Sequence, residues 1–146
     1  VVNMGLIDTF GALILPYSAS AFCVFSMRQA FLSLPKELSE AARIDGCNSF
    51  QFYYSVGLPL TKPFLGSLGI YTFLGVWNQY LWPLLVVNSV KMRTVQIGIG
   101  MMQNADGNAY GPIMAAAIMI LVPSILVFII GQKTLISGLT SGAIKG

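Results

Sequence analysis

Histidine is absent from this 146-residue chain, and charged residues make up only 9% of it. The lack of histidine removes the commonest metal ligand and general base. The two cysteines, Cys23 and Cys47, fit no metal-ligand spacing, and we expect them to remain unpaired. The sequence therefore predicts no catalytic residue, no cofactor, no metal site and no enzymatic activity.

The few charges are also bunched, which leaves three neutral runs at residues 9–27, 63–90 and 107–132. Soluble domains carry about 25% charged residues, whereas a helix that crosses a bilayer needs about 20 predominantly apolar residues. Each neutral run is long enough for one such helix. We therefore expect an all-α, polytopic membrane helical bundle in the lipid bilayer, with three transmembrane helices at about 9–27, 64–87 and 112–131. Each predicted span contains a proline and is expected to be kinked or locally opened: Pro16, Pro83 and Pro123.

The basic residues are distributed unequally between the two sides that three spans would create. One side would hold Arg28, Lys36, Arg43, Lys62, Lys133 and Lys145, and the other Lys91 and Arg93. The positive-inside bias then places the loop 32–63 and the C-terminal tail 132–146 in the cytoplasm, and the loop 88–111 outside. Because the basic residues are scattered, the net charge of +3 indicates no nucleic-acid partner.

The loop 32–63 contains signals for two short helices. Pro35 is tolerated in a first helical turn, and Glu40 sits early in the helix, where the dipole favours an acid. Gly46 is a candidate for the left-handed residue that ends the first helix. Asn48 and Gln51 have the spacing of a capping box at the start of the second.

The same loop contains Glu40-Ala41-Ala42, then Gly46, then Val56-Gly57-Leu58-Pro59. This pattern resembles the EAA loop of permease subunits of binding-protein-dependent ABC importers, and it departs only in having Val56 for isoleucine. The resemblance implies that segment 35–59 contacts a separate ATPase. The residues to which it assigns this coupling are Glu40, Ala41, Ala42, Asp45, Gly46, Leu58 and Pro59. The alternative reading is an amphipathic helix at the membrane interface.

A polar and aromatic cluster interrupts the second neutral run at Trp77, Asn78, Gln79 and Tyr80. Polar residues at membrane depth usually face a protein interior or an aqueous path, and aromatic rings can stack on a sugar. The cluster is therefore a candidate solute pathway. The alternative is packing and hydrogen bonding between helices. It also resembles a segment of carbohydrate-uptake permeases.

Two further segments have competing interpretations. The turn-rich end of loop 88–111 is either a connector or a surface that contacts a binding protein. The glycine-rich tail 132–146 is expected to be flexible. Its last residues resemble the C-termini of carbohydrate-uptake permeases. Residues 131–134 read Gly-Gln-Lys-Thr, but Gln132 replaces the glycine of a phosphate-binding loop, so we expect no ATP site.

The resemblance covers essentially the whole chain and points to the C-terminal half of a carbohydrate-uptake permease of the maltose or glycerol-3-phosphate type, with the MetI-like fold. It implies a multi-pass protein of the bacterial inner membrane that forms the pathway for a sugar or sugar-like solute. The implied partners are an ABC ATPase dimer, a second and non-identical permease subunit, and a periplasmic or lipid-anchored solute-binding protein. The competing hypotheses are an ion-gradient-driven transporter or channel, an intramembrane enzyme and a passive scaffold. All five acids lie outside the neutral runs, which argues against ion coupling.

Overall fold

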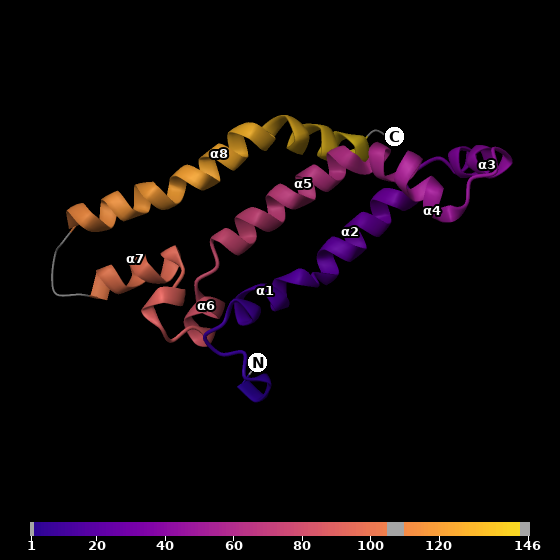
Figure 1. Cartoon of the computed structure of the whole chain (residues 1–146). Helices are drawn as coiled ribbons and strands as arrows, with labels where there is room; N and C mark the ends of the chain where they lie inside the picture. The colour runs from indigo at the N-terminus through magenta and orange to yellow at the C-terminus, as the bar shows by residue number, and fades with distance from the viewer. Residues whose placement is uncertain (1, 105–109, 144–146) are drawn as a thin grey trace. The chain divides into compact units, whose positions relative to one another are not determined.

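The computed structural model describes residues 2–104 and 110–143, and every regular element within them is helical (Figure 1). This confirms the predicted all-α class. In chain order the elements are η1 (Val2–Met4), α1 (Phe10–Ser18), α2 (Ala21–Leu32), α3 (Lys36–Ile44), α4 (Ser49–Phe52), the π-helical η2 (Tyr53–Gly57), α5 (Leu58–Trp77), α6 (Leu81–Val86), η3 (Val90–Met92), α7 (Val95–Asn104) and α8 (Tyr110–Ala143).

The helices form two compact units. The first unit consists of Val1–Ser20 and Thr72–Ile129, and the second of Ala21–Tyr71 and Ile130–Gly146. The boundary between the units falls inside α5 and inside α8, so each of these helices belongs partly to the first unit and partly to the second.

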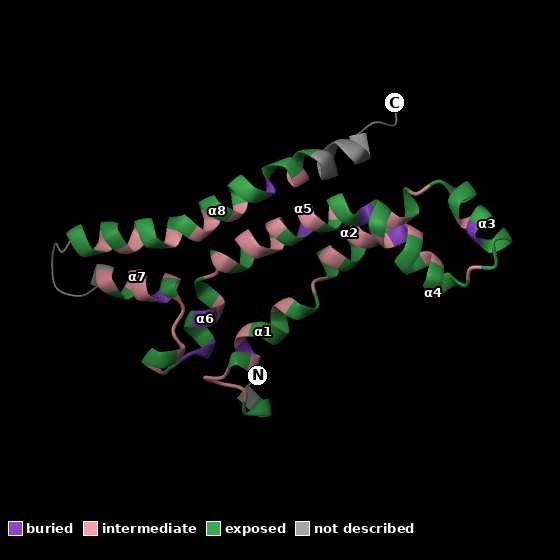
Figure 2. Ribbon diagram, turned by 45° about the horizontal axis from the view of Figure 1, so that its top comes forward, coloured by how far each residue is buried: buried purple, intermediate pink, exposed green. Residues whose placement is uncertain are grey.

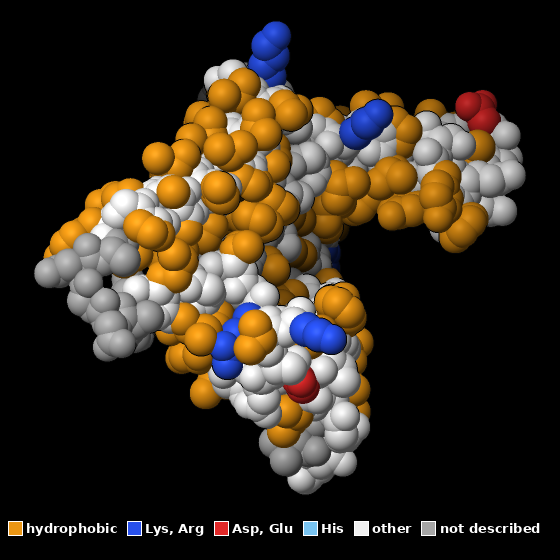
Figure 3. Space-filling view, turned by 60° about the vertical axis from the view of Figure 1, so that its left-hand side comes forward, with side chains coloured by type: hydrophobic (Ala, Val, Ile, Leu, Met, Phe, Trp, Pro, Cys, Tyr) orange, Lys and Arg blue, Asp and Glu red, His pale blue; other side chains and the backbone are white. Residues whose placement is uncertain are grey.

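Most large apolar side chains in the described residues are exposed (Figure 2). Hydrophobic side chains cover much of the face shown in Figure 3, where charged side chains are few and isolated. Exposed apolar surface on this scale is unfavourable in water and indicates lipid or protein contact. In the part of the chain whose side chains are described, the buried apolar residues are few: Ala12, Ala30, Ala42, Leu68, Val86, Val87 and Ile97.

Among the described residues, two stretches are long and apolar enough to cross a membrane, Phe10–Leu32 and Tyr110–Ile136. Helix α5 is 20 residues long but begins with Pro59, Lys62 and Pro63, and it is not among them. The expected helix over 64–87 is divided, because α5 ends at Trp77 and α6 begins at Leu81. The polar residues between them thus open this stretch locally.

Two other expectations were incomplete. Loop 88–111 contains a helix, α7, which buries Ile97. Its two glycines, Gly98 and Gly100, weaken the helical pattern in the sequence. The tail expected to be flexible from residue 132 instead continues α8 to Ala143, because no proline follows Pro123 and the helix packs on α5. Residues 105–109 of the loop and 144–146 of the tail lie outside the described residues.

In the first unit, Asp8 fastens the segment before α1 to the segment after α6. Its amide donates to the Val86 carbonyl at 2.8 Å. Its Oδ1 accepts from the Ser89 amide at 3.0 Å, the Ser89 hydroxyl at 2.9 Å and the Asn88 amide at 3.1 Å. These hydrogen bonds, those from Ser89 above all, lower the pKa of Asp8 from its usual 3.8 because they stabilise the carboxylate. Nearby, the Trp82 indole donates to the Ala12 carbonyl at 2.9 Å.

Candidate functional site

The first candidate site is the α3–α4 corner, which we define as residues 36–52 of the second unit. Helix α3 begins directly after Pro35, whose φ of −56° and ψ of 135° are those of an N-cap residue outside the helix. Glu37 lies in its first turn and Arg43 in its last. Both charges complement the helix dipole, which favours acids at the N-terminus and bases at the C-terminus.

Helix α3 ends in a complete Schellman motif. Gly46 has a φ of +79°, a left-handed conformation that glycine adopts without a steric penalty. The Gly46 amide donates to the Arg43 carbonyl at 3.1 Å, and the Cys47 amide donates to the Ala42 carbonyl at 2.9 Å. These two bonds satisfy carbonyls that a helix end otherwise leaves open. The prediction that Gly46 ends this helix in a left-handed conformation is therefore confirmed.

Helix α4 begins two residues later with a capping box. Asn48 Oδ1 accepts from the Gln51 amide at 2.8 Å, and Gln51 Oε1 accepts from the Asn48 amide at 2.8 Å. Both predicted partners are present. Because the last residue of the Schellman motif is joined directly to the first residue of the capping box, the direction of the chain through the corner is fixed by backbone–backbone and side-chain–backbone hydrogen bonds.

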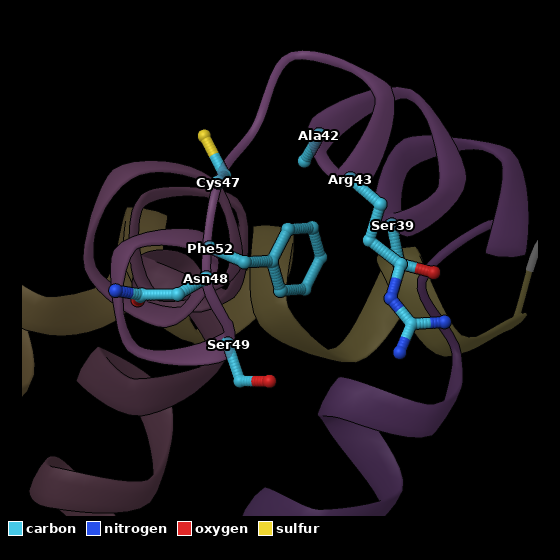
Figure 4. Close-up of a pocket in the computed structure, with 7 residues that line it drawn as sticks. All are labelled: Ser39, Ala42, Arg43, Cys47, Asn48, Ser49 and Phe52. Atoms are coloured by element: carbon cyan, nitrogen blue, oxygen red, sulfur yellow. The ribbon is translucent and has the colours of Figure 1, made fainter.

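The two helices enclose a hollow of about 430 Å³ (Figure 4). The Phe52 ring reaches across it toward Ala42 and Arg43, and Cys47 lies at the turn. Ala42 is buried, at 8% exposed, on the side of α3 that lines this hollow. The lining residues are Ser39, Ala42, Arg43, Cys47, Asn48, Ser49 and Phe52.

The coupling residues predicted from the sequence do not all lie together. Glu40, Ala41, Asp45 and Gly46 are exposed on the corner, where Ile44 is 86% exposed. Leu58 and Pro59 instead form the first turn of α5, beyond the π-helical turn η2. The corner therefore presents Glu40, Ala41, Asp45 and Gly46, whereas Ala42 is buried and Leu58-Pro59 lies in the helix that supports the corner.

Sequence reasoning missed the contacts that attach this support to α2. A Cβ on Gly57 would meet Phe31 Cε1 at 3.0 Å, a tight contact that the Phe31 ring would have to relieve by shifting. The Phe31 and Tyr53 rings lie 5.5 Å apart, and Tyr53 and Tyr54 pack edge to face at 5.0 Å. The sequence indicates this packing only through a glycine, Gly57, inside an aromatic-rich segment. Its partner Phe31 lies 26 residues away, so no local pattern identifies it.

The second candidate site is the break between α5 and α6 in the first unit. The Trp77 indole N–H donates to the Ile120 carbonyl of α8 at 3.2 Å, and its ring stacks on Phe73 at 5.7 Å. Gln96 of α7 donates through its side-chain amide to the Trp77 carbonyl at 3.3 Å. For Trp77, these contacts match the alternative of packing between helices.

The other three residues of this cluster differ in exposure. Asn78 is exposed, and its side-chain amide donates to the Leu74 carbonyl at 2.8 Å, which caps the end of α5. Gln79 is half-buried. Tyr80 is 40% exposed and lies over Gly100 of α7, where a Cβ would come within 3.0 Å of the Tyr80 ring. The cluster thus connects the break between α5 and α6 to the neighbouring helices α7 and α8.

Comparison with known proteins identifies a family and several relatives. The family described as "Binding-protein-dependent transport system inner membrane component" matches residues 1–138. The arabinooligosaccharides transport system permease protein AraQ of Halalkalibacterium halodurans is 40% identical over 146 residues, which are 100% of this chain and 52% of the relative. The sn-glycerol-3-phosphate transport system permease protein UgpE of Brucella melitensis is 43% identical over 141 residues, 95% of this chain and 50% of the relative.

The UgpE protein of Yersinia pestis is 40% identical over 141 residues, again 95% of this chain and 50% of the relative. The chain thus spans about half the length of the curated relatives it matches. The family match covers α3, α4, α5, α6 and α7 completely and α8 as far as residue 138. On this basis, the chain belongs to the family of inner membrane components of binding-protein-dependent transport systems.

Proposed function

We propose that this chain forms part of the permease of an ATP-driven importer and that its α3–α4 corner docks on a separate ATPase subunit. The observation that carries the proposal is the corner itself. A Schellman motif and a capping box fix its backbone, while Glu40, Ala41 and Asp45 stay exposed on it. A rigid, protruding helix end can transmit force between two proteins, and preorganisation lowers the entropic cost of docking.

The proposed topology places the corner in the cytoplasm and loop 88–111 outside. Six basic residues on one side and two on the other support it. Each transporter would contain two such corners, one from this permease and one from a second, non-identical permease, on an ATPase dimer. A periplasmic or lipid-anchored binding protein would deliver solute to the outer side.

The proposed solute is a sugar or sugar-like compound. Relatives named for arabinooligosaccharide and sn-glycerol-3-phosphate transport support this class. The candidate contacts remain Trp77, Asn78, Gln79 and Tyr80. Because the indole N–H of Trp77 is occupied by Ile120, Trp77 would offer its ring rather than its N–H to a solute.

An ion-gradient-driven transporter is disfavoured by the placement of the acids. Within the described residues, Asp8 precedes α1, and the other acids lie in or directly after α3. Helices α1, α2, α5 and α8 contain no carboxylate to couple an ion.

The experiment that tests docking is a single-cysteine cross-link in native membranes. Ala41→Cys, in a subunit whose native Cys23 and Cys47 are replaced, should capture a nucleotide-binding protein, with a yield that changes on ATP addition. Tyr110→Cys, exposed and on the proposed outer side, is the matched control and should capture none. Reagents that cannot cross membranes should label position 110 from outside and position 41 only from inside. Absence of capture at an accessible position 41 would contradict the docking assignment.

A charge reversal at Glu40 provides a second test. Glu40 is exposed, so Glu40→Lys should not disturb folding. If its carboxylate pairs with a basic residue of the ATPase, reversal should lower transport about tenfold or more, and Glu40→Gln should lower it less. Unchanged transport in Glu40→Lys would remove this residue from the docking contact.

A further inference from the structure

In the second unit, helices α5 and α8 approach each other at two reciprocal glycines. A Cβ on Gly66 of α5 would lie 2.5 Å from Thr134 Cγ2 of α8. A Cβ on Gly131 of α8, which is buried, would overlap the end of the Ile70 side chain of α5. Each helix therefore offers a glycine to a side chain of the other, and a Cβ at either position would force the facing side chain to move.

A hydroxyl group fastens the same contact. Ser67 is only 9% exposed, and its Oγ donates to the Thr134 carbonyl at 2.8 Å while lying 3.1 Å from the Pro63 carbonyl of its own helix. Small residues and side-chain-to-backbone hydrogen bonds hold membrane helices together where apolar burial alone cannot. A Cβ on Gly69, three residues on from Gly66, would meet nothing within 4 Å, so glycine is needed at particular places on α5 and not along its whole length.

This contact lies close to the α3–α4 corner along the chain. From α4 the chain continues through η2 into α5 without a loop, and Gly66 follows about two turns after α5 begins (Figure 1). Any displacement of the corner therefore reaches the α5–α8 contact through continuous helix. Interlocked side chains and a fixed hydrogen bond oppose sliding of one helix along the other.

We infer that the contact formed by Gly66, Ser67, Ile70, Gly131 and Thr134 stays closed throughout transport and carries displacement of the α3–α4 corner to the C-terminal part of α8. Gly66 and Gly131 are positioning residues in this arrangement. The inference rests on the proposed function and extends it from the docking surface to the helix that must move with it.

A reversible disulfide tests whether the contact stays closed. A Cβ on Gly66 would lie 3.8 Å from Thr134 Cβ, a separation that suits a disulfide, whose Cβ atoms are about 3.8 Å apart. In the full-length subunit, assembled in its transporter and lacking Cys23 and Cys47, Gly66→Cys with Thr134→Cys should oxidise readily. Transport by the oxidised form should equal transport after reduction. Failure to form the disulfide, or a transport block that a reductant reverses, would overturn the inference.

A size exchange tests whether the contact transmits the displacement. Gly66→Ala should lower transport per ATP hydrolysed about tenfold, a coupling loss in the usual range. Thr134→Ser removes the Cγ2 that the new methyl group would strike, so Gly66→Ala combined with Thr134→Ser should recover most of the coupling. Gly69→Ala is the matched control on the same helix and should change nothing.

Two outcomes would oppose the inference here: normal coupling in Gly66→Ala, or an equal loss in the double variant. Cross-linking at position 41 separates this inference from the proposed function. If position 41 still captures the ATPase while the disulfide blocks transport, docking stands and the closed contact is wrong.

Discussion

The α3–α4 corner and the break between α5 and α6 both interrupt a helical path, but different interactions close them. At the corner, the backbone bonds and the reciprocal Asn48–Gln51 pair join residues at most five positions apart. At the break, the Trp77 indole bonds to Ile120, 43 residues away, and the Trp77 carbonyl accepts from Gln96. The corner holds its own shape and leaves Glu40, Ala41 and Asp45 exposed, whereas the break also depends on its neighbouring helices.

The largest effect is expected from replacing Gly46, the left-handed residue of the corner. Gly46→Pro cannot reach a φ of +79° and also loses the amide that bonds to Arg43. The cost should be roughly 3 kcal/mol or more, enough to abolish coupled transport while membrane insertion continues. Transport and ATP hydrolysis in proteoliposomes measure the effect.

The control for this change is Gly46→Asn, because asparagine tolerates the left-handed conformation better than other residues with a side chain. It should keep most of the transport. If Gly46→Pro transports normally, the rigid corner is not needed for coupling.

The next test is made at the break. Trp77→Ala removes both the stacking on Phe73 and the bond to Ile120 and should cost about 3–5 kcal/mol. Trp77→Phe keeps a ring and loses the N–H bond, for about 1 kcal/mol. Thermal unfolding in detergent measures both. Equal, small losses would mean that the break, like the corner, is closed by local bonds alone.

The capping box offers a smaller and more local test. Asn48→Ala should cost about 1 kcal/mol, which should speed amide hydrogen exchange in α4 roughly fivefold and leave residues 77–80 unchanged. Ser49→Ala, one position further on, is the matched control. Faster exchange at the break in Asn48→Ala would show that the two interruptions are linked.

The smallest expected effect is a pH dependence confined to the first unit. The pKa of Asp8 is lowered on folding, so its contribution to stability is full above its usual 3.8 and is lost as the pH falls through the lowered value. Asp8→Asn keeps a residue that tolerates the φ of 60° but cannot titrate. Thermal scans at decreasing pH should show a loss of stability in the parent protein that is absent from Asp8→Asn. The same loss in both proteins would assign it to another group.

The same difference explains what could be predicted from the sequence. Gly46 and the Asn48–Gln51 pair were predictable because their partners lie within a few positions and their conformations favour particular residue types. Helix α7 was missed because two glycines weaken its helical pattern, although tertiary packing of Ile97 outweighs that weakness. The Trp77–Ile120 bond and the glycines facing Ile70 and Thr134 join residues far apart in sequence, and no local pattern specifies such pairs.

The π-helical turn Tyr53–Gly57 has a practical consequence for work on this segment. Each residue of an α-helix advances about 100° around the axis, whereas a π-turn holds one extra residue without starting a new turn. A helical wheel drawn straight through residues 49–77 would therefore assign α4 the wrong angular phase by about one residue. Spin labels or cysteines intended for the same face on both sides of Tyr53–Gly57 must be chosen with that offset, or they will report different environments.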